Sequence, residues 1–237
     1  MVMTSTLLCD RKRDSAFVAL RRLVELTYPD TTIYVNIETN DFNGWGDVLK
    51  FLEDSGRPFH YDFWTHKSSW AGKPAFDQDQ ARLHPICIAR NMSIQAAMGL
   101  GASHIFQVDA DVVVPVDSIE RLLALDRPLV GGLVPGRGAH MYAQYLSHIK
   151  SNVNGIVECE YATCGFALVR HDLFSVLKYR SGPHNTERNV MLSEDPAYGT
   201  DAHDRWGVPW WTVDTNLRAE HIDSPHNPLT LDQVAQF

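Results

Sequence analysis

The first half of the chain alternates between short apolar runs and longer amphipathic stretches. The runs at 31–38 and 104–108 are rich in β-branched and aromatic residues, which predicts buried strands. Between such runs apolar residues recur at helical spacing, as Phe17, Leu20 and Val24 do. The pattern predicts strands at 5–9, 31–38, 58–64, 104–108 and 129–134 and helices at 14–28, 45–53, 89–99 and 118–125. Strands that alternate with helices are typical of an α/β fold with a parallel sheet.

The second half of the chain is less regular. Residues 155–170 predict two strands that can pair antiparallel, and residues 194–206 predict a helix after the N-cap residue Ser193. A short strand is expected at 208–213, followed by a helix-like stretch at 216–220. The predicted loops are the polar segments 65–84 and 180–193 and the Gly-containing segment 135–140. Because no repeat, low-complexity tract or linker interrupts the chain, we expect one domain.

Length and composition exclude some classes of protein. A chain of 237 residues, 44% of them hydrophobic, fits a single soluble domain. The net charge of −8 gives no overall attraction to nucleic acid or to anionic membranes. There is no run of 18 apolar residues and no signal peptide, and the four cysteines lack C-x-x-C spacing. We therefore expect a soluble, cytoplasmic protein with reduced thiols.

Two acidic residues, Asp109 and Asp111, directly follow the predicted strand at 104–108. Burying an unpaired carboxylate is costly, so packing alone seldom puts two acids at the end of a buried strand. Carboxylates at the carboxyl end of a strand can hold a divalent cation, which can in turn hold a diphosphate. Mg²⁺ and Mn²⁺ suit such oxygen ligands. A D-x-D triplet is common by chance, so its interpretation depends on the motifs around it.

Four further motifs accompany this triplet. Ala89-Arg90-Asn91 opens a helix before it, and Gly165 in a strand, Glu194-Asp195 at a helix start and His221 follow it. In this order and spacing, over residues 1–222, the chain resembles the GT-A-fold glycosyltransferases of the large family-2 type. The resemblance implies a single Rossmann-like GT-A-type domain over residues 1–237, with a mostly parallel central sheet flanked by helices and a small antiparallel acceptor-side portion. Within it, residues 1–134 would bind the nucleotide-sugar and residues 135–237 the acceptor.

The resemblance also implies an activity and a metal. The enzyme would move a sugar from a nucleoside-diphosphate-sugar, with a UDP-sugar first among the donors, to a hydroxyl acceptor with inversion. The acceptor would be a glycan, a small molecule or a modified DNA base. Asp109 and Asp111 would bind Mn²⁺ or Mg²⁺, with Asp109 also near the donor ribose. His221 would complete the metal site, with His226 as the alternative ligand.

Catalytic and donor-binding roles follow from the same resemblance. Asp195 would be the general base that deprotonates the acceptor hydroxyl, with Glu194 beside it. Acids at a helix start are also favoured by the helix dipole alone. Arg90 and Asn91 would contact the donor, or Arg90 would support the strand that carries Asp109.

The remaining expected contacts involve the donor base and the acceptor. Arg11, in the basic loop after the first strand, and Glu38, at the end of the second, are expected near the donor. The segment 36–41 departs from the D-D-G-S pattern common among relatives, which leaves the identity of the base open. On the acceptor side, Gly165 marks a close approach of another group to its strand. The pair Trp210-Trp211 either packs in the core or stacks on a sugar.

Three other interpretations stay open. A nucleotidylyltransferase would use a similar sheet and metal, but it needs a G-x-G loop with a lysine, which Asp10-Arg11-Lys12 does not supply. A non-catalytic nucleotide-sugar binder would keep Asp109 and Asp111 without needing Asp195. A phage-type DNA glycosyltransferase acting on a hydroxylated base would work in the host cytoplasm. The net charge argues against it, and a group of basic residues argues for it: Arg11, Lys12, Arg13, Arg21 and Arg22.

Overall fold

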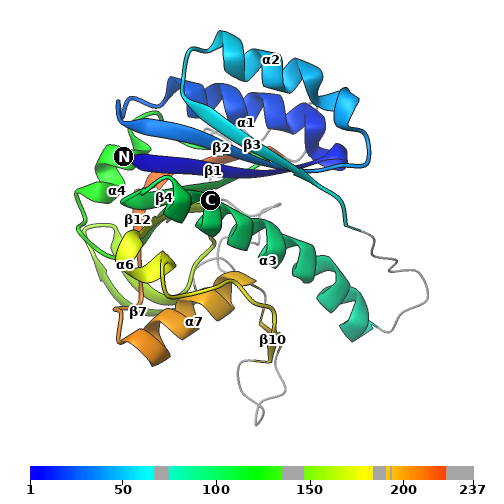
Figure 1. Ribbon diagram of the computed structural model, residues 1–237. Helices are drawn as coiled ribbons and strands as arrows, with labels where there is room; N and C mark the ends of the chain where they lie inside the picture. The colour runs from blue at the N-terminus through cyan, green and yellow to red at the C-terminus, as the bar shows by residue number, and fades with distance from the viewer. Residues whose placement is uncertain (67–74, 135–146, 184–190, 193, 223–237) are drawn as a thin grey trace.

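The structure, a computed structural model, describes residues 1–66, 75–134, 147–183, 191–192 and 194–222 (Figure 1). The predicted loop at 135–140 and the alternative ligand His226 lie outside this part of the chain. The described residues form a nine-stranded sheet with helices on both faces, and its strand order is β3-β2-β1-β4-β9-β6-β12-β8-β7. The two short pairs β10-β11 and β13-β5 lie apart from this sheet.

The strands of the first half are β1 Val2–Cys9, β2 Thr31–Glu38, β3 Phe59–Trp64, β4 His104–Asp109, β5 Val112–Val113 and β6 Leu129–Leu133. Those of the second half are β7 Ser147–Val153, β8 Ile156–Tyr161, β9 Phe166–Arg170, β10 Gly182–Pro183, β11 Met191–Leu192, β12 Trp211–Arg218 and β13 Glu220–His221. The α-helices are α1 Arg13–Glu25, α2 Gly46–Asp54, α3 Ala75–Gly99, α4 Ser118–Leu123, α6 His171–Phe174 and α7 Glu194–Trp206, and the 3-10 turns are η1 Asp10–Lys12 and η2 Phe42–Trp45. No helix in these ranges combines the length and the apolar character needed to cross a bilayer.

The sheet confirms the predicted α/β class. Strands β3, β2, β1 and β4 pair in parallel, as do β12 and β6. Strands β7, β8 and β9 run antiparallel to their neighbours, which places the antiparallel portion in the second half. From β1 the chain moves outward to β2 and β3, and α3 then returns it to β4 on the other side of β1. Such a reversal leaves a crevice beyond the carboxyl ends of β1 and β4, where α/β proteins bind ligands.

Two layers of buried apolar side chains hold the helices to the sheet. Ile33 and Phe106 belong to the layer shared with α1 and α2, which cover one face. Their chain neighbours Tyr34 and Ile105 belong to the layer shared with α3 and α7 on the other face. Successive side chains of a strand point to opposite faces, so strands covered on both sides read as continuous apolar runs.

Three predicted elements differ from the structure. Residues 75–84, expected in a loop, begin α3, which continues through Pro85. The segment contains no other proline or glycine, and a proline costs one helical hydrogen bond without ending the helix here. The stretch 216–220 was predicted to be helix-like, which is wrong: β12 extends to Arg218, and β13 pairs with β5. Strands β8 and β9 exist as expected but pair with other strands.

Candidate functional site

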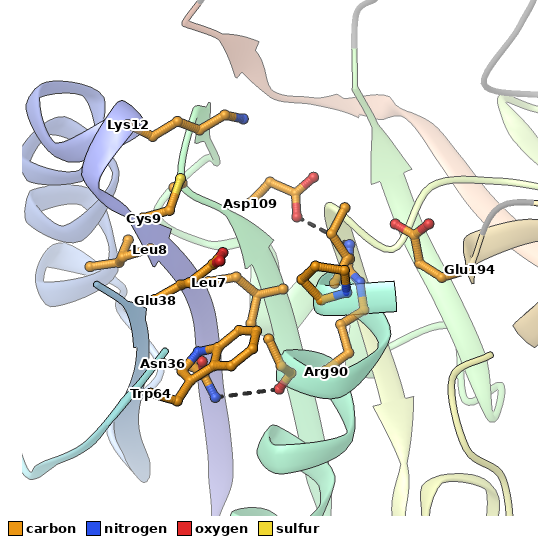
Figure 2. Close-up of a pocket in the computed structure, with 14 residues that line it drawn as sticks. Leu7, Leu8, Cys9, Lys12, Asn36, Glu38, Trp64, Arg90, Asp109 and Glu194 are labelled. Carbon is orange, nitrogen blue, oxygen red and sulfur yellow. Dashed lines mark hydrogen bonds and ion pairs between the residues drawn. The ribbon is translucent and has the colours of Figure 1, made fainter. Parts of the chain in front are cut away.

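A cavity lies at the crevice beyond the parallel strands (Figure 2). The strand register puts Cys9 beside Glu38, Glu38 beside Trp64, and Leu7 beside Asp109, so the ends of four strands meet there. Helix α3 and the start of α7 supply further walls. The predicted site residues in the lining are Glu38, Arg90, Asp109 and Glu194. Lys12, Asn36 and Trp64, which were not among the expected donor contacts, line it as well.

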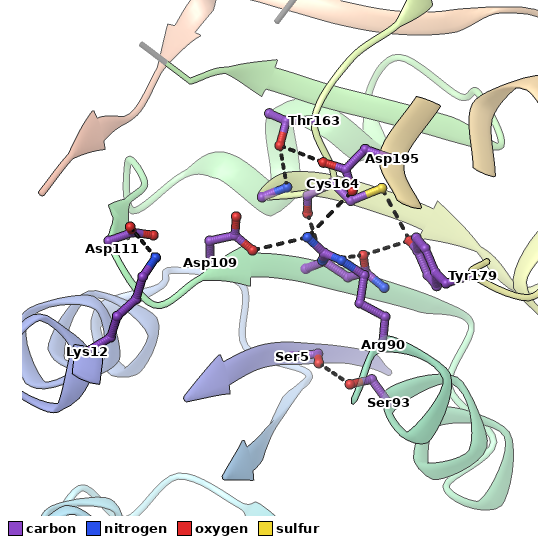
Figure 3. A network of polar contacts seen from close by, with 12 residues as sticks. Ser5, Lys12, Arg90, Ser93, Asp109, Asp111, Thr163, Cys164, Tyr179 and Asp195 are labelled. Carbon is purple, nitrogen blue, oxygen red and sulfur yellow. Dashed lines mark hydrogen bonds and ion pairs between the residues drawn. The ribbon is translucent and has the colours of Figure 1, made fainter. Parts of the chain in front are cut away.

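Asp109 is bound by a buried arginine. Arg90 Nη2 donates to Asp109 Oδ1 at 3.1 Å, and Arg90 Nη1 donates to Gln107 Oε1 at 3.1 Å (Figure 3). Arg90 is 3% exposed. Burial acts to lower the pKa of Arg90, but the carboxylates of Asp195 and Asp109 raise it well above its usual value. Arg90 therefore stays charged, and its contacts with Gln107 and Asp109 hold the end of the strand that carries Asp109.

Gly165 lets the Asp109 carboxylate approach the backbone of the neighbouring loop. A Cβ placed on Gly165 would lie 2.5 Å from Asp109 Oδ2, closer than Cβ atoms come to other atoms. The backbone N–H of Asp109 also donates to the carbonyl of Gly165 at 3.0 Å. The glycine is thus needed for space beside Asp109, which is the close approach that its place in the sequence indicated.

Asp195 approaches the same Arg90 nitrogen, Nη2, that binds Asp109. Its Oδ1 is 3.6 Å from Arg90 Nη2, and its Oδ2 accepts a hydrogen bond from Thr163 Oγ1 at 3.1 Å. Glu194 instead faces the cavity, and its Oε2 has no hydrogen-bond partner within the described parts of the chain. Burial, followed by the charge of Asp195, raises the pKa of Glu194 to about 7. The two acids of the pair therefore have different surroundings: Thr163 and Arg90 hold Asp195, whereas Glu194 is a buried carboxyl with a raised pKa that faces the cavity.

Asp111 has two partners of its own, a lysine and a histidine. Lys12 Nζ contacts Asp111 Oδ2, and His221 Nε2 lies 3.4 Å from the same oxygen. The pairing of β13 with β5 puts His221 directly opposite Val112 and so brings it to Asp111. Burial acts to raise the pKa of the Asp111 carboxyl, but the hydrogen bond from His221 and the charge of Lys12 hold it well below its usual value.

Two of the three expected metal ligands come together. Asp111 and His221 are adjacent, whereas Asp109 is engaged by Arg90. Within the described ranges, no group of three His, Cys, Asp or Glu side chains can hold a metal ion. An oxygen and an imidazole nitrogen fit a divalent cation that takes its other ligands from diphosphate oxygens and water, as Mg²⁺ commonly does. Asp109 as a third protein ligand does not fit this conformation, because its carboxylate is turned to Arg90.

Of three residues expected to contact the donor, Glu38 lines the cavity, Asn91 does not, and the side chain of Arg11 is not described. Both polar atoms of the Asn91 side chain bind the backbone of Tyr179, at 2.9 and 2.8 Å, so this amide anchors the segment before α7. Asn91 is also absent from the cavity lining. Glu38 lines the cavity at the end of β2, where it was expected. The side chain of Arg11 lies outside the described part of the structure, and its neighbour Lys12 is the cation that reaches the cavity.

The two tryptophans of the expected acceptor side separate. Trp211 is fully buried in the core beside Gly199, where an added Cβ would lie 2.2 Å from Trp211 Nε1. Its assignment to an acceptor surface is therefore corrected to a core position. Trp210 stacks on His203 with ring centroids 3.4 Å apart, and Lys150 Nζ lies 5.4 Å from its ring centroid. Neither tryptophan lines the cavity.

Several functional contacts had no signal in the sequence. Thr163 and Gln107 hold Asp195 and Arg90, yet isolated polar residues beside strands occur widely. Trp64 ends β3 at the cavity, and its alignment with Glu38 depends on strand register. Lys12 is the exception, because the sequence placed it in a basic loop after the first strand, where a cation was expected near the donor.

Comparison with known proteins identifies the fold. No protein-family model and no curated protein sequence matches the chain. The crystal structure of S. aureus TarS 1–349 in complex with UDP-GlcNAc is similar, with a TM-score of 0.57, 11% identity, and coverage of 92% of this chain and 57% of that one. For the longer S. aureus TarS structure the TM-score is 0.59 at 11% identity, with 92% and 36% covered.

A third similar structure is the mannosyltransferase PcManGT from Pyrobaculum calidifontis in complex with GDP-Man and Mn²⁺. Its TM-score is 0.56 at 11% identity, with 92% of this chain and 55% of that chain covered. The chain thus spans less than two thirds of the length of each of these proteins. At this identity the likeness concerns the fold alone, and it shows that the chain has the GT-A-type fold of these glycosyltransferases.

Proposed function

We propose that this protein is a metal-dependent glycosyltransferase that moves a sugar from a nucleoside-diphosphate-sugar to a hydroxyl acceptor with inversion. The observation that carries the proposal is the position of Asp109 and Asp111, at the carboxyl end of β4 beside the switch point. Ligands of α/β sheets bind at this position. The cavity there is bounded by acids and by Lys12, which suits a nucleotide bound through its phosphates and a cation.

The metal would be Mn²⁺ or Mg²⁺, held by Asp111 and His221. A divalent cation at this place would neutralise charge that develops on the leaving nucleoside diphosphate. The carboxylate–imidazole pair supports either ion, and imidazole is the better ligand for Mn²⁺. The structure of PcManGT, which shares the fold, is a complex with GDP-Man and Mn²⁺.

Asp195 is proposed as the general base for the acceptor hydroxyl. Thr163 and Arg90 orient its carboxylate from one side, as the fixed position of a base requires. Glu194, next in the chain and facing the cavity, is proposed to contact the donor sugar. Attack from the side opposite the leaving diphosphate inverts the anomeric carbon, so an α-linked donor would give a β-linked product.

A UDP-sugar is the proposed donor. Asn36 and Trp64 line the part of the cavity beside Glu38, and Asn36 Oδ1 has no hydrogen-bond partner in the described residues. An aromatic ring and an amide oxygen suit a flat base with a ring N–H, such as uracil. Guanine shares these features, so a donor screen must include GDP-sugars.

A DNA base as acceptor has less support. Of the basic group near the N-terminus, Lys12 contacts Asp111, Arg13 contacts Asp47 at 2.7 Å, and Arg22 contacts Glu25 at 3.5 Å. Basic side chains already paired with acids offer less charge to phosphates of a nucleic acid. A glycan or a small hydroxylated molecule is therefore the first acceptor class to test.

The test is a donor screen by hydrolysis, using UDP-, GDP- and ADP-sugars with Mn²⁺ or Mg²⁺ and with excess chelator. We expect release of UDP that requires the metal, because unshielded carboxylates and diphosphate repel one another. Asp111→Asn should abolish metal-dependent UDP binding, whereas the surface variant Asp172→Asn should not. Full activity in chelator would contradict the metal site, and an α-linked product by NMR would contradict inversion.

A further inference from the structure

The carboxylate of Asp111 is shared by two side chains from distant parts of the chain. Lys12 reaches it from η1, as Figure 3 shows, and His221 lies near the same oxygen, Oδ2, from β13. The Asp111 side chain is 3% exposed, whereas that of Lys12 is 39% exposed. A buried carboxylate needs a counter-charge, and here an ammonium from the cavity wall supplies it.

This ammonium stands where a divalent cation would have to bind. A cation held between Asp111 and His221 would lie beside Oδ2, the oxygen that Lys12 contacts, and two positive ions repel at such short range. Lys12 is also suited to leave, because a lysine carries its charge on a flexible four-carbon stem. Arg90 is not suited to leave its carboxylates, because it is buried and held by Asp109, Gln107 and Asp195.

We propose that Lys12 is a tethered counter-ion, which holds the Asp111–His221 site when no divalent cation is bound and leaves it when the cation and a nucleoside diphosphate enter together. The second half of this inference rests on the proposed function, because the diphosphate is what would receive the displaced ammonium. The device makes binding of the cation and of the nucleotide cooperative. Cation alone must displace Lys12 without a new partner for it, whereas cation with diphosphate supplies one.

The first experiment measures Mn²⁺ binding without any nucleotide, by the EPR signal of free Mn²⁺, in wild type and in Lys12→Met. Typical coupling between two sites corresponds to roughly 5–150-fold in affinity, and we expect Lys12→Met to bind Mn²⁺ tighter by a factor in this range. The matched control is Lys50→Met, which removes an exposed lysine paired with Asp54 on α2 and should leave Mn²⁺ binding unchanged. Adding Asp111→Asn to Lys12→Met should remove the gain.

The second experiment repeats the Mn²⁺ titrations of both proteins in the presence of UDP. UDP should tighten Mn²⁺ binding to wild type more than to Lys12→Met, because only wild type has an ammonium to transfer to the diphosphate. Equal or weaker binding of Mn²⁺ alone by Lys12→Met would overturn the proposal, and so would the absence of Mn²⁺ binding from both proteins. These readouts need no sugar transfer. The counter-ion proposal can therefore be contradicted while the proposed glycosyltransferase activity is confirmed, or confirmed while that activity is contradicted.

A third experiment uses only the wild-type protein, so its result does not depend on whether Lys12→Met folds. Acetylation of Lys12 by an amine-reactive ester, followed by mass spectrometry, reports how free its ammonium is. Saturating Mn²⁺ alone should raise the labelling rate of Lys12 relative to Lys50, and Mn²⁺ with UDP should lower it again. A Lys12 rate that Mn²⁺ leaves unchanged would contradict the displacement.

Discussion

Asp109 and Asp111 are separated by one residue and have opposite surroundings. Asp109 is bound by Arg90, which is almost fully buried and bonded on several sides. Asp111 is itself buried, but its cation Lys12 comes from the exposed wall of the cavity. Strand β4 ends at Asp109, so the two residues do not share one face of a strand. The same residue type therefore pairs with a fixed, buried arginine at one position and, as we propose, with an exchangeable lysine at the other.

The difference shows how a site can be both preorganised and open to a cation. The half around Arg90 also holds Asp195, and the buried guanidinium of Arg90 pairs with both Asp109 and Asp195. The half around Lys12 and His221 is held by the contact that we propose a cation replaces. Variants should accordingly have large effects on turnover or folding in the first half and effects mainly on cation binding in the second.

The largest effect is expected on catalysis. Asp195→Asn keeps the shape and the hydrogen bond to Thr163 but cannot accept a proton, so turnover should fall by roughly 10²–10⁴-fold while UDP binding stays near normal. Steady-state rates and calorimetric UDP titration measure the two quantities, with Asp172→Asn as surface control. Turnover at the wild-type level would move the base elsewhere. Glu194 would then be the next candidate, because Asp201 is bound by Arg180 at 2.6 and 2.8 Å.

The half of the site around Arg90 should also contribute to the free energy of unfolding. Arg90→Met removes the buried counter-charge that Asp109 and Asp195 share. Breaking a buried pair typically costs about 3–5 kcal/mol of unfolding free energy, and we expect a loss at the lower end of this range because the Asp109 side chain is 36% exposed. Urea denaturation measures this. The control Arg170→Met removes an exposed arginine paired with Asp172 and should cost less than about 1 kcal/mol. A similar loss of unfolding free energy in both variants would show that the contacts of Arg90 stabilise the protein no more than an exposed ion pair does.

Glu194 gives a pH-dependent test within the same half. Its pKa is about 7 in the folded protein against 4.5 for the ordinary side chain, so between these pH values the folded state keeps a proton that the unfolded state has lost. Stability therefore falls as pH rises from 4.5 to 7, and the full cost persists above 7. Glu194→Gln removes this cost and should be more stable than wild type at pH 8 by up to ~3 kcal/mol. Urea denaturation at pH 5 should show a much smaller gain, and the exposed-site variant Glu53→Gln should show none.

The smallest of these effects concerns the space beside Asp109. Gly165→Ala forces the Asp109 carboxylate away from a Cβ and should cost about 1–3 kcal/mol, as overpacking usually does. Gly46→Ala is the matched control, because no atom lies within 4 Å of its added Cβ and its φ is −58°. That control should be neutral or slightly stabilising. Thermal or urea unfolding distinguishes the two, and equal stability would mean that Asp109 has room to move.

Several features could be predicted from the sequence because their causes are local. Strand β2 and helix α7 have the predicted bounds, since β-branched density and helical periodicity with a cap residue are local signals. The position of Asp109 and Asp111 at a strand end followed from the apolar run before them. Helix α3 was placed too late because the polar segment 65–84, with Gly72 and Pro74, resembled a loop, whereas the helix begins at Ala75 and continues through Pro85.

The sequence by itself determined the α/β class, the strand that ends in two acids, and the residue types able to hold a cation. Tertiary structure decided that Asp109 faces Arg90 and Asp111 faces Lys12 and His221. It also decided that β13 brings His221 to β5, more than one hundred positions away in the chain. Local preference fixes which residues extend or coil, but the partner of a buried charge depends on strand register and helix packing, which are set by contacts between distant parts of the chain.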